Sequence, residues 1–303
     1  MTVAVLLLLT GCGGKVTAHV LRDPPTHAPK KAEQPAVAPA PKASQLPRGG
    51  TEIFPAHRVV AFYGASGQPG LGVLGATDPN TAADQLERQA AAYAPYGRPV
   101  LPALDLITSL ATDFPGHSND YSEADDPSVV MQYLNVARAH RMLLLLDFQP
   151  GTSDFLSQIE QYRQFLELPD VGVALDPEWR MAPGQVPGQE TGQVSAAEIN
   201  QVAEYLANIV DKFSLPQKLL VVHQFNADMV TDRGAVGTWP ELAVTFDVEP
   251  WGSPHDKEQA YQQLAPVGSW YAGFKLFDQL DSPLLTPAQV MALKPQPDMI
   301  TYE

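Results

Sequence analysis

Cysteine is nearly absent from this chain of 303 residues, and positive charge is scarce in it. A single cysteine excludes an intramolecular disulfide framework. The 19 lysines and arginines face 34 aspartates and glutamates, so the net charge is -15. A chain this acidic is unsuited to binding nucleic acid by neutralising phosphates. The hydrophobic fraction of 45% nevertheless matches a folded globular protein and excludes a wholly disordered chain.

Long hydrophobic runs are also lacking. Residues 2–9 form a short apolar run with the length of a signal-peptide core rather than of a membrane span. The sequence Leu9-Thr10-Gly11-Cys12 follows and resembles the lipobox of bacterial lipoproteins, in which the cysteine is lipidated. We therefore expect residues 1–12 to be a lipoprotein signal peptide and lipobox. Lipidated Cys12 would anchor the protein to the extracytoplasmic face of the cell membrane.

The next segment, 13–50, has seven prolines and no aromatic residue, a composition typical of a disordered linker. It carries six basic and two acidic residues, which leaves 13 basic and 32 acidic residues, a net charge of -19, in 51–303. The positive linker suits a segment beside anionic lipid headgroups, and a merely soluble tether is an equally open alternative.

Residues 51–303 alternate predicted strands with predicted helices. The eight apolar runs predicted as strands are 59–64, 99–107, 142–149, 171–179, 218–225, 242–251, 270–278 and 299–303. The amphipathic stretches predicted as helices are 80–96, 127–140, 153–167, 195–213, 254–265 and 286–293.

This alternation predicts an α/β fold with parallel strands, and eight of them fit a (β/α)₈ barrel of the TIM type. The final helix is expected to be missing, because the sequence ends at the eighth predicted strand. The alternative is a doubly wound sheet. It usually has a phosphate-binding glycine turn after its first strand, and the glycine-rich stretch 64–75 lacks that pattern.

Polar residues collect where the predicted strands end, and carboxylates close six of the eight. In such barrels the active site lies at these ends. Part of the pattern is expected anyway, because aspartate favours the cap of a following helix. The residues expected to bind substrate are Tyr63, Asp105, Asp147, Trp179, His223, Trp251, Lys275 and Glu303. The two tryptophans suit sugar stacking or a place in the core, and an inward-facing Lys275 would need Asp247, Glu249 or Glu303 as its partner.

The sharpest motif is Leu175-Asp176-Pro177-Glu178-Trp179. On a continuous strand, Asp176 and Glu178 would point to the same face, and mutual repulsion would raise the pKa of one carboxyl. A protonated carboxyl beside an ionised one is the arrangement that glycoside hydrolysis uses. We expect Glu178 to donate the proton with help from Asp176, and Asp247 or Glu249 to be the opposing carboxylate.

An Asp-x-Glu pair closing the fourth strand of a secreted barrel resembles glycoside hydrolases of family 18, the chitinase type, and the barrel lysozymes of family 25. The resemblance implies that Glu178 is the general acid and that Asp176 orients an acetamido group or stabilises the developing charge. The chain is also similar to uncharacterised bacterial surface lipoproteins with a TIM-barrel domain.

Three functional hypotheses remain open. The first is an enzyme acting on glycosidic bonds of cell-wall or environmental polysaccharide without a cofactor. The second is a non-catalytic lipoprotein that binds a glycan, or another small polar ligand, or scaffolds the envelope. The third is a metal-dependent hydrolase in which His223 joins the nearby carboxylates, since such mixed sites suit Mg, Mn or Zn.

Overall fold

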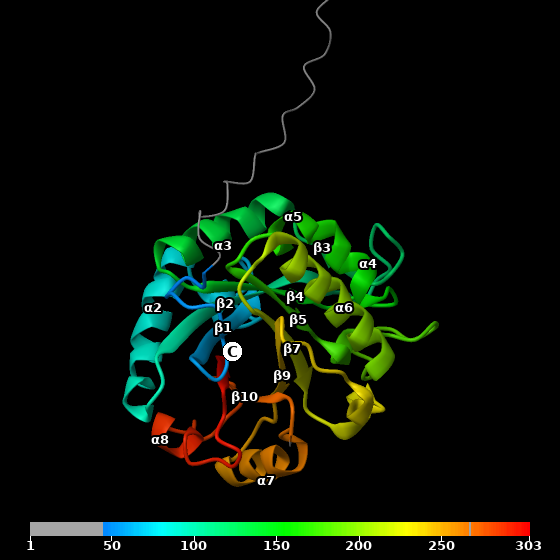
Figure 1. The fold of residues 1–303 in the computed structure, drawn as a ribbon. Coiled ribbons are helices and arrows are strands. Elements are labelled where there is room, and N and C mark those ends of the chain that lie inside the picture. The colour runs from blue at the N-terminus through cyan, green and yellow to red at the C-terminus, as the bar shows by residue number, and fades with distance from the viewer. Residues whose placement is uncertain (1–44, 267) are drawn as a thin grey trace, which may run out of the picture. The chain divides into compact units, whose positions relative to one another are not determined.

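Eight parallel strands close into a barrel in the computed structural model, which describes residues 45–266 and 268–303 (Figure 1). In ring order they are β1 (Arg58–Ala65), β2 (Val100–Ala111), β4 (Leu143–Phe148), β5 (Val171–Leu175), β7 (Lys218–Gln224), β9 (Leu242–Val248), β10 (Tyr271–Leu276) and β11 (Met299–Tyr302). Strand β1 pairs with both β2 and β11, which closes the ring. The predicted α/β fold of the TIM type is confirmed. The predicted signal peptide, Cys12 and residues 13–44 of the linker lie outside the described residues.

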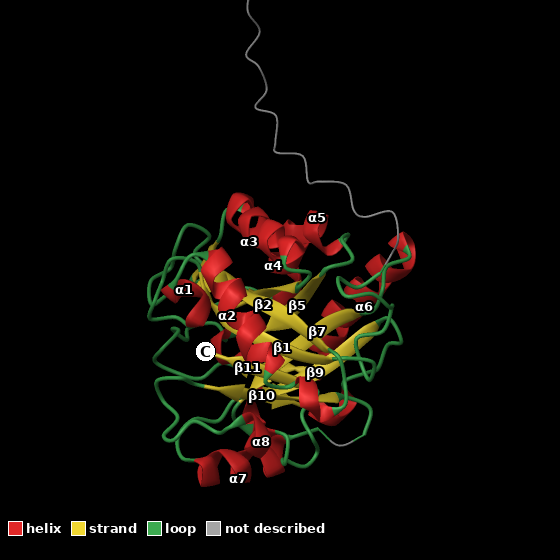
Figure 2. Cartoon of the chain, turned by 90° about the vertical axis from the view of Figure 1, so that its left-hand side faces the viewer, coloured by secondary structure: helices red, strands yellow, loops and turns green. Residues whose placement is uncertain are grey.

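Helices surround the barrel (Figure 2). They are α1 (Val73–Ala76), α2 (Pro79–Ala91), α3 (Pro127–Ala139), α4 (Phe155–Ile159), α5 (Arg163–Leu166), α6 (Ala196–Phe213), α7 (Pro254–Leu264) and α8 (Pro287–Val290). Strand β11 is the last element of the described chain. Three short strands complete the fold: β3 (Ser122–Ala124) runs antiparallel to β2, while β6 (Val194–Ser195) pairs with β8 (Val230–Thr231).

Two predicted helices are shorter or more broken than expected. Instead of one helix over 153–167, the chain forms α4, a 3₁₀ turn and α5. The break falls where Tyr162 turns inward, packs 5.7 Å from the Phe148 ring and donates a 2.6 Å hydrogen bond to the Asp125 carbonyl. The helix predicted over 286–293 is the single turn α8, which a capping box at Thr286 begins.

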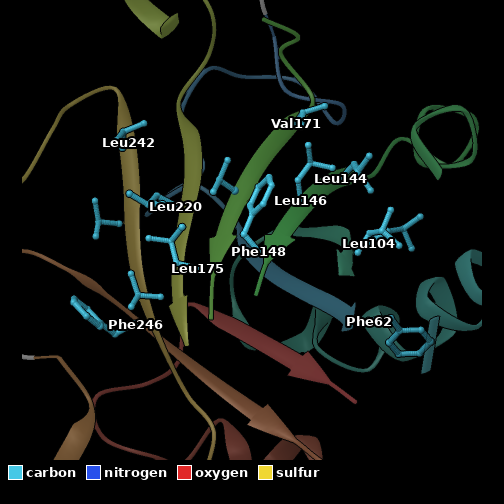
Figure 3. Packing of buried hydrophobic residues seen from close by; sticks show 14 of the residues in the cluster. Phe62, Leu104, Leu144, Leu146, Phe148, Val171, Leu175, Leu220, Leu242 and Phe246 are labelled. Carbon is cyan, nitrogen blue, oxygen red and sulfur yellow. The ribbon is translucent and has the colours of Figure 1, made fainter. Parts of the chain in front are cut away.

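The main hydrophobic core lies between the strands and the helices. Because side chains alternate along a strand, every second residue points outward, and these positions are almost all aliphatic or aromatic. Figure 3 shows this layer, with Leu104 on β2, Leu144 and Leu146 on β4, and Leu220 on β7. Strands buried on both faces read as continuous apolar runs, which is why their positions could be predicted from the sequence.

A second apolar cluster fills the lower half of the barrel, at the amino ends of the strands. Inward-facing Val59, Leu101 and Leu143 lie in it together with Leu46 and Phe54, which precede the first strand. Arg48 fastens this segment by hydrogen bonds to the carbonyls of Val100 and Arg141, at 3.1 and 3.2 Å. Residues 46–54 therefore form the floor of the barrel, and the folded domain begins before residue 51, the boundary expected from composition.

Truncating the floor should destabilise the whole domain. Leu46 is 3% exposed, so Leu46→Ala should lower the free energy of unfolding by about 2–5 kcal/mol. The matched control is Leu284→Ala, at a side chain that is 38% exposed, and its effect should stay within about 0.5 kcal/mol. Urea denaturation of the two variants compares them directly. Equal stability would show that the segment does not belong to the folded unit.

Candidate active site

The upper half of the barrel interior, at the carboxyl ends of the strands, is polar. The same alternation that fills the lower half with apolar side chains directs one further layer inward: Tyr63, Asp105, Asp147, Asp176, His223, Asp247, Lys275 and Thr301. Gly273 makes room for this layer, because a Cβ atom there would lie 2.5 Å from an oxygen of Asp247. The strand ends do converge as the sequence predicts.

Four predicted residues lie beneath the cleft rather than in its wall. Asp105, Asp147, His223 and Asp247 are 0% exposed. The His223 ring lies between carboxylates, with Nε2 3.3 Å from Asp147 and Nδ1 3.4 Å from Glu249. Asp247 accepts a 2.7 Å hydrogen bond from the Thr301 hydroxyl. These four side chains cannot touch a sugar, so they act on the cleft only through their neighbours.

Burial and charge set the protonation of this layer. Burial first, and then the charge of Asp147, raise the pKa of Asp105 to about 8, so that Asp105 holds a proton at neutral pH. Burial disfavours a charged His223. The charge of Glu249, together with the direct contacts of the ring with Asp147 and Glu249, outweighs that effect and raises the pKa of the imidazole well above its ordinary value. A positive ring therefore lies below Glu249.

Lys275 joins the cleft to this buried layer. Its Nζ lies 3.1 Å from Glu249, 2.7 Å from Glu303 and 3.6 Å from the centre of the Tyr63 ring. The expectation that an inward lysine needs an acidic partner is confirmed, with Glu249 and Glu303 in that role. Burial alone would raise the pKa of Glu249, but Lys275 and then His223 lower it to about 2. Glu249 is therefore held ionised.

Glu178 reaches the cleft by a different route from the one predicted. Strand β5 ends at Leu175, so the expected strand over 171–179 is too long and the same-face argument is wrong. Pro177 lacks the N–H that would continue the ladder, and Pro177–Trp179 form a 3₁₀ turn instead. Burial first, and then the charge of Glu249, raise the pKa of the half-buried Glu178 to about 7.

The turn that carries Glu178 is fastened to its surroundings. The Glu178 carbonyl accepts a 2.6 Å hydrogen bond from Gly192. Arg180, which follows the turn, lies 2.9 Å from Glu198 on α6. Glu198 also accepts from the Phe155 N–H at 3.1 Å. These contacts attach the loop after β5 to α6 and α4, which holds the Glu178 backbone in position.

Asp176 lies at the base of the cleft and is 5% exposed. Its Oδ2 accepts hydrogen bonds of 3.4 Å from Tyr63 and from Gln149, while its Oδ1 has no hydrogen-bond partner. Burial first, and then Glu249, raise the pKa of Asp176 well above its ordinary value. Asp176 is therefore a neutral carboxyl that retains a free position for a ligand.

Asp176, Glu178, Glu249 and Lys275 line a cleft of about 240 Å³. Its aromatic walls are Trp179, Phe225 and Trp251, and Trp251 is 53% exposed, which excludes the core position considered for it. Phe225 and Trp251 meet edge to face at 5.4 Å. The predicted residues that line the cleft are Tyr63, Asp176, Glu178, Trp179, Glu249, Trp251, Lys275 and Glu303.

Sequence reasoning missed the apolar part of the lining. Phe225 and Phe277 directly follow β7 and β10, and Leu280 lies in the loop after β10. We searched the strand ends for polar residues only, so the two phenylalanines were missed, although both lie at strand ends. Leu280 carries no sequence signal, because nothing in a loop indicates which side chain turns toward the mouth.

No protein-family model matches the chain, and no curated protein matches it. The structure shows the TIM-type barrel, and neither comparison supports the resemblance to glycoside hydrolases or to surface lipoproteins. Within 45–266 and 268–303, no three histidine, cysteine, aspartate or glutamate side chains are arranged to hold a metal ion. None of the helices in that part of the chain has both the length and the apolar character needed to cross a membrane.

Removing the positive charge at position 275 should raise the pKa of Glu249 toward the ordinary value of a glutamate. In Lys275→Met we expect the pKa of Glu249 to rise from about 2, because Lys275 is the strongest group that lowers it. NMR of ¹³C-labelled glutamate measures this pKa, with circular dichroism confirming the fold. Lys275→Arg should retain a low pKa, and so should Lys212→Met at an exposed position. An unchanged pKa in Lys275→Met would contradict the assignment.

Proposed function

We propose that the protein hydrolyses glycosidic bonds, with Glu178 as general acid and Glu249 as the opposing carboxylate. The observation that carries this proposal is a pair of glutamates in one cleft whose pKa values diverge, to about 7 and about 2. Two neighbouring carboxyls whose pKa values differ in this way are typical of a general acid paired with an ionised carboxylate. The aromatic walls of the cleft add the surfaces on which sugar rings stack.

The proposed mechanism follows from the protonation states. Protonated Glu178 gives its proton to the glycosidic oxygen as the bond to the anomeric carbon breaks. Ionised Glu249 faces the positive charge that develops on the sugar, as nucleophile or as the base that activates water. Neutral Asp176 hydrogen-bonds a sugar substituent through its unpartnered oxygen. Lys275 and His223 keep Glu249 ionised and take no proton from the substrate.

The second acidic candidate from the sequence, Asp247, does not suit the opposing role. It is 0% exposed and bonded to Thr301, and it is absent from the lining of the cleft. Glu249, two residues further along the chain, lines the cleft and lies 3.1 Å from Lys275. We therefore assign the anionic role to Glu249 alone.

Glu178→Gln should abolish hydrolysis and keep the fold. The assay is release of reducing ends from polysaccharides and peptidoglycan by residues 45–303, and we expect a loss of about 10²–10⁴-fold. The matched control is Glu190→Gln, at an exposed glutamate in the same loop. Wild-type activity should fall as the pH rises through about 7, because Glu178 then loses its proton.

Full activity in Glu178→Gln would remove Glu178 from the mechanism. If the wild type binds a glycan and releases no reducing end from any substrate, the non-catalytic glycan-binding hypothesis replaces this one.

We further propose that the protein is a lipoprotein anchored through Cys12 on the extracytoplasmic face of the membrane. The support is the position of the one cysteine directly after Leu9-Thr10-Gly11, at the end of an apolar run. This proposal concerns the first 12 residues and is independent of the hydrolytic one.

Lipid labelling tests the anchor. The full chain expressed in a bacterial host should incorporate labelled palmitate and fractionate with membranes, whereas Cys12→Ala should do neither. Thr17→Ala, just beyond the lipobox, is the control and should behave as wild type. Labelling that persists in Cys12→Ala would refute the assignment.

A further inference from the structure

A second hollow adjoins the cleft and extends it. It measures about 260 Å³ and lies between residues 69–76, a segment that ends with α1, and the loop after β10. Phe277, Leu280 and Glu303 line both hollows, so the two meet along these side chains. We call the two hollows together the groove. A polymer bound along it would contact Phe277, Leu280 and Glu303 and reach into both hollows.

Carboxyl groups line the groove along its length. The described lining includes five of them, from Asp176, Glu178, Glu249, Asp278 and Glu303. Asp176 is neutral, whereas Glu249 is held ionised. Lys275 is the one basic residue among them; it is 2% exposed and already paired with Glu249 and Glu303. No cation of this described lining is therefore free to meet a ligand. An anionic glycan would be repelled from such a surface.

A buried carboxyl oxygen in the groove is left for a ligand. Asp176 Oδ1 has no hydrogen-bond partner although Asp176 is 5% exposed, and an unpaired buried oxygen is costly. An ammonium group has three donors and no acceptor, which suits a lining made of carboxyl oxygens. The raised pKa values of Asp176 and Glu178 agree with this requirement, since the nearby charge of Glu249 contributes to both and a bound cation would offset it.

We propose that the groove takes a polysaccharide whose sugars carry free amino groups, that is, a partly or fully de-N-acetylated amino-sugar chain. As a substrate assignment this inference rests on the proposed glycosidase function, whereas the binding preference does not. The net charge of -19 over 51–303 adds a long-range attraction for such a cationic polymer.

Matched oligosaccharides test the preference. Tetramers of glucosamine and of galactosamine, with all amines free or all acetylated, are titrated by calorimetry into Glu178→Gln and into wild type where no cleavage occurs. At about pH 6 sugar amines, like α-amino groups, are protonated. We expect the free-amine chains to bind on the order of tenfold tighter at low salt, and the preference to shrink as salt rises.

A variant in the second hollow gives a local control. Asp278→Asn should weaken binding of the free-amine chains, whereas Asp113→Asn, at an exposed aspartate outside both hollows, should leave it unchanged. Equal effects of the two variants would show that the overall charge of the domain, and not the groove, causes the preference for free-amine chains. That result would overturn the groove assignment.

The outcomes separate this inference from the proposed function. Binding of free-amine chains without cleavage supports the inference and removes the hydrolytic mechanism. Cleavage of acetylated chains with equal or tighter binding retains the mechanism and overturns the inference. Failure to bind any of the four tetramers also overturns the inference.

Discussion

A lysine placed inside a barrel is the constraint on which the upper half of this molecule depends. Lys275 points inward from β10 and has almost no contact with water, so its charge must be met by carboxylates. Glu249 and Glu303 meet it at 3.1 and 2.7 Å. The pairing keeps Glu249 ionised at neutral pH, and the negative charge of Glu249 then helps to raise the pKa values of Asp176 and Glu178. The buried cation thus sets the charge of Glu249, while burial is the largest cause of the raised pKa values of Asp176 and Glu178.

The barrel interior has an apolar lower half and a polar upper half. Below, Val59, Leu101 and Leu143 lie in one buried apolar cluster with Leu46 and Phe54. Above, the same strands supply charged and hydroxyl groups. The outward-facing side chains of the strands pack against the surrounding helices, and this core holds the strands that carry the polar groups.

Much of this arrangement could be predicted from the sequence, because an apolar run that ends in polar residues is a local signal of a buried strand. It located all eight barrel strands and the acidic residues at their ends. The geometry at Asp176 and Glu178 could not be predicted, because whether Pro177 continues or ends a strand depends on contacts such as Gly192 with the Glu178 carbonyl. The burial of Asp105 and His223 beneath the cleft could not be predicted either. The alternation of side chains shows which residues point into the barrel, but not how far each lies from the barrel mouth.

The closed end of the barrel also determines how the domain responds to tension. Leu46 and Arg48 attach the start of the described chain beside the amino ends of the strands, opposite the cleft. A pull through the preceding chain would load the packing of Leu46 and the hydrogen bonds of Arg48 first. The cleft, at the other end of the strands, would stay unstrained. The floor would thus bear a load applied through the preceding chain, in addition to closing the barrel.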